Sequence, residues 1–253
     1  MIDLLWWQYL IIGITFIWSG FVRTGLGFGG AVLALPVLLL IVDDPLVFLP
    51  IISIHLLIFS CWNAWEGHRG KRGSSSTIDW SYLSSSLKIM IVPKLIGVFG
   101  LLTLPNELMS AIIFTIVCVY SVGYILNRPF RSNSIWLDRF FLTLGGYVSG
   151  TSLIAAPLVI AVYSTHVARH QLRDTLFVLW FILVSIKMAS FLIAGVDLQL
   201  QHQLWLFPCA LIGHFLGKRL HNYLMQTDTL KFYRIMGLIL LTLSLIGIAK
   251  TLV

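Results

Sequence analysis

Charged residues are scarce in this chain of 253 residues, and acidic ones are the scarcest. Only 11% of the residues are charged and 58% are apolar, with a mean hydropathy of +0.92. An average soluble domain has about 25% charged residues. The chain therefore lacks the polar residues that cover a surface facing water, which excludes a soluble enzyme and a disordered segment. We predict a membrane protein with several spanning segments.

Cysteine is also rare, with only Cys61, Cys118 and Cys209 far apart in apolar runs. An odd number at such spacing fits neither a disulfide framework nor a zinc site. The net charge of +7 comes from basic residues between hydrophobic segments. Basic residues in that position contact lipid headgroups and set orientation. We expect membrane lipids as partners, and no nucleic acid, cofactor or metal.

The apolar residues form nine long runs. A spanning helix needs about 20 apolar residues, whereas barrel strands have about 10 with alternating polarity. The runs therefore predict an all-α protein of about eight transmembrane helices plus broken or re-entrant segments. The N-terminus has no basic start and no cleavage site, so it is interpreted as a membrane helix. The runs are 5–22, 25–42, 45–65, 81–102, 107–127, 139–163, 175–196, 203–217 and 231–251.

Loop charges predict the orientation of the chain in the membrane. The loops at 68–72, 128–139, 169–173 and 218–219 are basic. The positive-inside rule places them in the cytoplasm. Other connections carry acidic residues, and counting crossings then places both termini outside. Whether 5–22 and 25–42 both span or form a re-entrant hairpin is left open.

An internal repeat is predicted from a shift of 121 residues. The shift divides the chain into a first membrane repeat, 1–127, and a second, 128–253, within one membrane domain. Loop charges change sign between the two, as an inverted-topology repeat requires, and such repeats are typical of secondary transporters. A helical bundle with similar composition in both halves is the alternative. The shift lays Gly25, Gly29, Ala34 and Pro36 over Gly146, Gly150, Ala155 and Pro157.

The two Gly-Pro segments are candidate ligand sites. Glycine and proline interrupt helical hydrogen bonding and leave N–H groups free, which is tolerated at membrane depth where they line protein or a cavity. Free N–H groups at a helix start bind anions. Close helix packing is the other interpretation. The candidate residues are Gly25, Gly27, Gly29, Gly30 and Pro36 in the first segment, and Gly150, Thr151, Ser152 and Pro157 in the second.

The first segment has the spacing Gly-x-Gly-x-x-Gly of a dinucleotide site, but it lies between apolar helices and not in a βαβ unit, so that interpretation is discarded. Its sequence GLGFGG ahead of Ala34-x-Pro36, with GYVSGTSLIAAP in the middle of the chain, resembles the sulfite exporter TauE/SafE family. The resemblance implies a bacterial inner-membrane transporter of small sulfur-containing or organic acid anions. Gly27, Gly29, Gly30 and Pro36 match the first family signature. The residues that match the second are Gly146, Gly150 and Pro157.

Two lysines, Lys94 and Lys187, lie deep in apolar runs, and Lys88 lies nearer an end. Each buried ammonium needs a partner, and all ten acidic residues lie in loops or at segment ends. We expect Lys94 and Lys187 to contact an anionic substrate and Lys88 to reach the headgroups. His55 and His214 are candidates for proton coupling, with hydrogen-bonded packing as the alternative.

The sequence therefore predicts a secondary transporter that moves a small anion by alternating access. An anion channel would share the lysines. An intramembrane serine hydrolase would need Ser149 as nucleophile and His214 as base, and Gly146-x-x-Ser149-Gly150 has one residue too many for G-x-S-G. We do not expect an enzyme. His166 and His170 have the spacing of a metal pair without a third ligand, so no metal site is expected.

Overall fold

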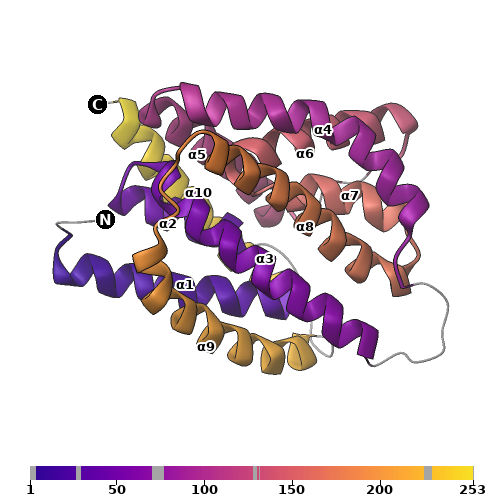
Figure 1. The fold of residues 1–253 in the computed structure, drawn as a ribbon, viewed down its shortest axis with the longest axis horizontal. Coiled ribbons are helices and arrows are strands. Elements are labelled where there is room, and N and C mark those ends of the chain that lie inside the picture. The colour runs from indigo at the N-terminus through magenta and orange to yellow at the C-terminus, as the bar shows by residue number, and fades with distance from the viewer. Residues whose placement is uncertain are drawn as a thin grey trace. The chain divides into compact units, whose positions relative to one another are not determined.

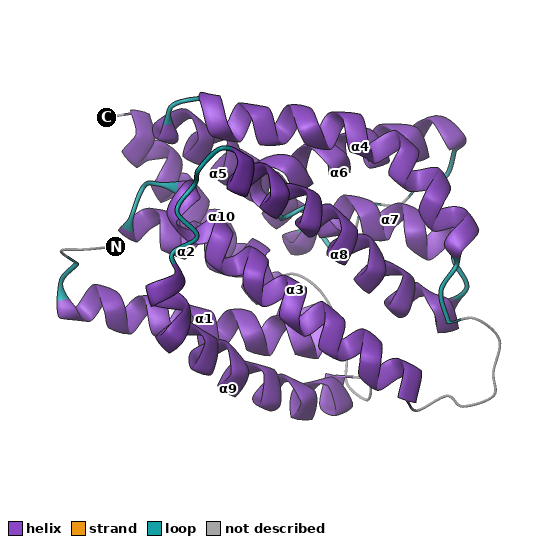
Figure 2. Ribbon diagram, in the orientation of Figure 1, coloured by secondary structure: helices purple, strands orange, loops and turns teal. Residues whose placement is uncertain are grey.

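Helices form the framework of the protein (Figure 2). The computed structural model describes residues 4–26, 30–69, 77–127, 130, 132–224 and 230–252, and within these ranges it has ten helices and no strand. The prediction of an all-helical protein is confirmed. The helices are α1 (Trp6–Leu26), α2 (Gly30–Ile41), α3 (Pro45–Arg69), α4 (Trp80–Thr103), α5 (Asn106–Ile125), α6 (Ile135–Ser152), α7 (Ala156–His166), α8 (Arg169–Ile193), α9 (Leu200–Leu224) and α10 (Leu230–Leu252).

Five of these helices are long and apolar enough to cross a membrane, namely α3, α4, α5, α8 and α10. Helix α2 is also apolar but has only 12 residues, which is too short to span. The chain is therefore a multi-pass membrane protein. The expected number of about eight spanning helices is not reached by this measure within the described residues.

The chain forms two compact units, and the first combines Met1–Ile51, Leu104–Pro129 and Asp197–Val253. Within this unit α1 packs along α9 and α5 packs along α10. The short helix α2 contacts α1, α5 and α10. Figure 1 shows α1 and α9, from opposite ends of the sequence, side by side.

The second unit combines Ile52–Thr103 with Phe130–Val196. Within it α4 packs along α6, and α7 follows α6 and contacts it. Helix α8 contacts both α4 and α7. The deep lysines of α4 and α8 and the second Gly-Pro segment all belong to this unit.

The predicted division at residues 127 and 128 follows sequence similarity, whereas the compact units follow packing. Each unit takes helices from both halves of the chain, since α1, α2 and α5 share a unit with α9 and α10. The two divisions are therefore different, and the repeat boundary stays a prediction.

Candidate functional site

The second Gly-Pro segment contains a break between two helices. Helix α6 ends at Ser152, Leu153 follows in a left-handed conformation with φ of 62°, and α7 begins at Ala156. Pro157 lies in the first turn of α7, where its missing N–H costs no hydrogen bond. Among the residues that the structure describes, no side chain caps this helix start. The predicted break is confirmed, and it leaves first-turn N–H groups of α7 without a side-chain acceptor.

The first Gly-Pro segment lies between α1 and α2. Gly27 and Gly29 are outside the described residues, while Gly25 and Gly30 are buried. A Cβ added to Gly30 would lie 2.7 Å from the carbonyl oxygen of Ser19, so α2 begins pressed against α1. Pro36 is buried in the interior of α2, not at its start. The two prolines therefore differ in their position within the helix.

Lys94 is fully buried at the crossing of α4 and α6. Its Nζ donates to the carbonyl oxygen of Ser149 at 3.1 Å and to Ser149 Oγ at 3.0 Å. Helix α4 can approach α6 this closely because Gly150 follows Ser149, and a Cβ at Gly150 would overlap the Lys94 carbonyl oxygen. The crossing thus holds a cationic side chain next to the end of α6.

Lys187 of α8 is also fully buried, and among the described residues its Nζ has no hydrogen-bond partner. The Nζ atom lies 5.7 Å from the centre of the Phe191 ring. A cation above an aromatic ring is attracted to it, but the ring accepts none of the three N–H donors in a conventional hydrogen bond. Helices α4 and α8, which carry Lys94 and Lys187, contact each other within the second unit. The structure therefore brings together the two lysines that the sequence singled out.

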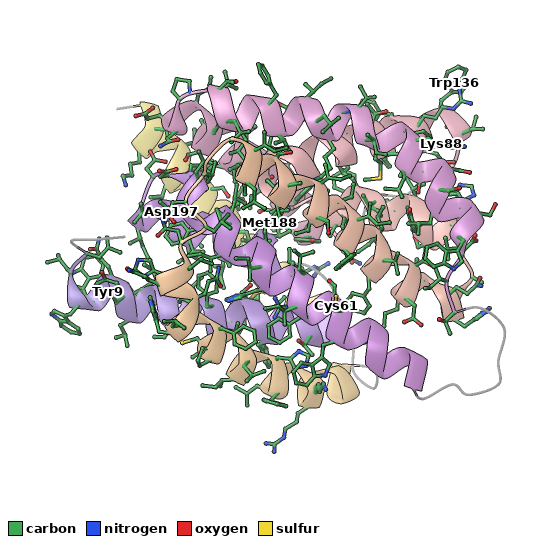
Figure 3. The ribbon with its side chains drawn as sticks, viewed as in Figure 1. Tyr9, Cys61, Lys88, Trp136, Met188 and Asp197 are labelled. Atoms are coloured by element: carbon green, nitrogen blue, oxygen red, sulfur yellow. The ribbon has the colours of Figure 1, made fainter. Side chains whose placement is uncertain are left out.

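Lys88 has a different environment from the other two lysines. It lies on α4 (Figure 3) and is exposed, whereas Lys94 on the same helix is buried. That Lys88 reaches the headgroups stays a prediction.

Buried negative charge is absent from the part of the chain whose side chains are described. The buried charged residues there are Arg23, Lys94 and Lys187, and none is aspartate or glutamate. Burying a charge without a partner is costly, because the interior solvates it poorly. The site is thus an electropositive interior without a carboxylate of its own among these residues.

The hydroxyl groups of Thr151 and Ser152 are buried in the last turn of α6. Both donate to the carbonyl oxygen of Val148, at 3.2 Å and 3.1 Å. In this arrangement their donors point into the helix. Their predicted contact with a ligand remains a prediction and would need a rotation about χ1.

The first unit has a polar group at its own helix crossing. His214 of α9 is fully buried, and its Nδ1 lies 2.7 Å from Oγ1 of Thr24 on α1. The neighbouring Arg23 is buried as well. His55 is buried in α3, within the second unit. The two histidines therefore lie in different units, and proton coupling through either one stays a prediction.

Sequence reasoning missed two residues of these crossings. The nucleophile interpretation of Ser149 does not predict that it supplies both acceptors of Lys94. Arg23 lies between two apolar runs in the sequence. A gap of two residues is too short for a loop that faces water, and that signal could have identified Arg23 as buried.

His166 pairs with the carboxylate of Asp138. Its Nε2 lies 2.8 Å from Asp138 Oδ2, at the ends of α7 and α6 that face each other, and His170 is exposed. Within the described residues no three His, Cys, Asp or Glu side chains gather as a metal site would require.

Comparison with known proteins identifies one family. The family model described as Sulfite exporter TauE/SafE matches residues 11–246, from within α1 to within α10. No curated protein and no solved structure matches the chain.

Proposed function

The chain belongs to the sulfite exporter TauE/SafE family of membrane transporters, and we propose that it is a secondary carrier for a small anion. Candidate substrates are sulfite, an organosulfonate or a related organic acid anion, moved across the bacterial inner membrane by alternating access. The observation that carries the proposal is the Lys187 ammonium. It is fully buried on a helix that contacts the helix of Lys94, and it has no hydrogen-bond partner among the described residues.

A bound anion would supply the missing partner. Intramembrane cations pair with other groups or mark an ion pathway. The described residues offer these two lysines no buried carboxylate. The break before α7 adds N–H donors and the positive end of a helix dipole, which favour the same kind of ligand. The last turn of α6, where Lys94 is bound, leads directly into that break.

Alternating access would come from an inverted repeat of five helices, which helix lengths support. Helices α1 to α5 have 21, 12, 25, 24 and 20 residues, and α6 to α10 have 18, 11, 25, 25 and 23. Both series place a long helix first, a short one second and three long ones after it. The reversal of loop charge between the halves supports opposite orientations.

Helix contacts within the second unit give a register for the repeat. Glycines let α4 and α6 meet backbone to backbone. A Cβ on Gly146 would collide with the carbonyl oxygen of Met90, and a Cβ on Gly97 with that of Tyr147. Small residues at such crossings allow close approach of membrane helices.

The first unit has the same pattern where α1 crosses α9. A Cβ on Gly20 would collide with the carbonyl oxygen of Ala210, and a Cβ on Gly217 with that of Phe21. Every position on α1 is 126 residues before its counterpart on α6, and every position on α9 is 120 residues after its counterpart on α4. The first offset differs from the sequence shift of 121 by five residues and the second by one residue. The equivalent pairs are Gly20 and Gly146, Phe21 and Tyr147, Ala210 and Met90, and Gly217 and Gly97.

The same register makes His214 the counterpart of Lys94. Each is fully buried and hydrogen-bonded across its crossing, His214 to Thr24 and Lys94 to Ser149. The proposed half-sites are therefore chemically different, with a lysine amine in one and a histidine ring in the other. Anion binding is assigned to the half with the lysines.

Transport by lysine variants tests the proposed function. We expect Lys94→Ala and Lys187→Ala to lower the initial uptake of radiolabelled sulfite into proteoliposomes at least about tenfold, because each removes a cation that the anion would neutralise. Lys88→Ala, on the exposed side of α4, should transport at the wild-type rate. Size-exclusion profiles should show that all three variants fold. Wild-type uptake by both buried-lysine variants would contradict the proposal.

Counterflow separates a carrier from an anion channel. Unlabelled sulfite inside the vesicles should accelerate entry of labelled sulfite through a carrier, since the loaded site returns faster than the empty one. A channel would show no such acceleration. Sulfite that enters at the same rate with and without internal sulfite would therefore exclude alternating access.

A further inference from the structure

We propose that the site between α4 and α8 selects oxyanions that carry two negative charges over those that carry one. The inference rests on the proposed function and specifies its substrate by charge. Lys94 of α4 and Lys187 of α8 lie in one compact unit, in which these two helices contact each other. Both side chains are fully buried, and no aspartate or glutamate is buried among the described residues.

The hydrogen-bond donors of the two lysines are unequally used. Each ammonium has three N–H donors. Lys94 uses two of them on the carbonyl and hydroxyl oxygens of Ser149, so one remains. Lys187 uses none on a described residue, so three remain. Four N–H donors are thus left for a ligand, three of them on Lys187 of α8. Four donors suit a ligand with several equivalent oxygen acceptors.

Charge balance decides between the two classes of anion. A monoanion would neutralise one ammonium and leave the other buried with an uncompensated charge. A dianion neutralises both and also relieves the repulsion between them. Charges interact more strongly in the interior of a protein than in water, so one unit of charge outweighs small differences in anion shape. Ser149 cannot substitute for the second negative charge, because its oxygens are neutral.

Sulfate and methanesulfonate make a matched pair of probes. Both are tetrahedral at sulfur, and they differ by one charge where an oxygen is replaced by a methyl group. We expect wild-type protein in proteoliposomes to bind sulfate at least about tenfold more tightly than methanesulfonate, measured as inhibition of labelled sulfite uptake. Thiosulfate, another dianion, should follow sulfate.

Removal of one lysine charge should reverse the preference. In Lys187→Gln one ammonium remains, so methanesulfonate should become the better inhibitor of the residual uptake. Lys187→Arg keeps the charge and should keep the preference for sulfate, and Lys88→Gln should behave as the wild type. If Lys187→Gln does not fold, Lys94→Gln can be used in its place, because it also leaves one of the two lysine charges.

The outcomes separate this inference from the proposed function. Sulfite uptake with equal inhibition by sulfate and methanesulfonate would leave the carrier standing and overturn the charge selectivity. A Lys187→Gln or Lys94→Gln protein that still prefers sulfate would overturn it as well. If the wild type transports no sulfite and binds none of the three probes, as judged by thermal shift, the proposed function fails and this inference fails with it.

Discussion

At the residue scale, Lys94 and Lys187 are equally buried but held in different ways. Lys94 is fixed by two hydrogen bonds to Ser149, whereas Lys187 faces the ring of Phe191. A lysine fixed by neighbouring oxygens contributes to the packing of α4 on α6 as well as to the charge of the site. Lys187 has no such acceptor among the described residues. In the proposed site, Lys187 therefore acts mainly through its charge.

Ser149→Ala tests the structural part of this difference. The variant removes one of the two acceptors of Lys94 and leaves the backbone acceptor in place. We expect the free energy of unfolding in detergent to fall by about 1–3 kcal/mol, since a buried charged donor loses a partner. Sulfite uptake should persist at a reduced rate.

The matched control for this variant is Ser85→Ala on the same helix as Lys94. Ser85 is exposed and its hydroxyl bonds only to the carbonyl oxygen of Ser81, so its loss should leave stability unchanged. If Ser149→Ala unfolds at the wild-type temperature, the hydrogen bond to its hydroxyl contributes nothing. If it abolishes uptake while remaining folded, the serine has a role in transport beyond holding Lys94.

At the element scale, backbone contact through glycines sets the distance between α4 and α6. Gly97 lies against the carbonyl oxygen of Tyr147, where no side chain fits. The same crossing brings Lys94 to Ser149. A change in helix separation would therefore alter the site as well as the packing.

Gly97→Ala tests this coupling. The added methyl group should push α4 away from α6, lowering the free energy of unfolding by about 1–3 kcal/mol and reducing sulfite uptake. Gly13→Ala is the control. Its Cβ would meet only ordinary contacts with Trp205 and Cys209, so the better helix propensity of alanine should keep or raise stability by about 0.5–1 kcal/mol. A Gly97→Ala protein as stable and active as the wild type would contradict the close contact.

The elements were largely predictable from the sequence, but their partners were not. Apolar runs of helical length and the sequence around Pro157 were enough to predict helices and a break. Proline alone could not distinguish the start of α7 from the interior of α2, where Pro36 lies, because both positions follow a Gly-rich segment. The sequence also singled out Lys94 and Lys187 by their depth. It could not indicate Ser149 as the acceptor, since that contact depends on which helices cross and on their register.

At the scale of the whole molecule, loop charge predicts the orientation in the membrane. The connection between α4 and α5 carries Glu107 and no basic residue, while the one between α5 and α6 has Arg128, Arg131 and Arg139 at or near it. The positive-inside rule assigns these connections to opposite sides.

Single cysteines test this orientation. In a background where the three native cysteines are replaced by serine, Glu107→Cys should react with a membrane-impermeant thiol reagent on intact bacterial cells. Asn133→Cys should react only after the cells are permeabilised. Both native side chains are exposed, so accessibility alone does not distinguish them. Labelling of Asn133→Cys in intact cells would place the basic connection outside and reverse the topology.

The interleaved order of the two units has a consequence for biosynthesis. All the segments of the second unit precede residue 197, whereas α1 finds its partner α9 only after residue 200. During synthesis, the last segment of the unit with the two lysines leaves the ribosome before the last segment of the other unit. Helix α1 is therefore synthesised long before α9, the helix along which it packs. A chain that stops after α8 would thus retain every segment of the lysine-bearing unit and leave α1 without its companion, exposed to quality-control proteases.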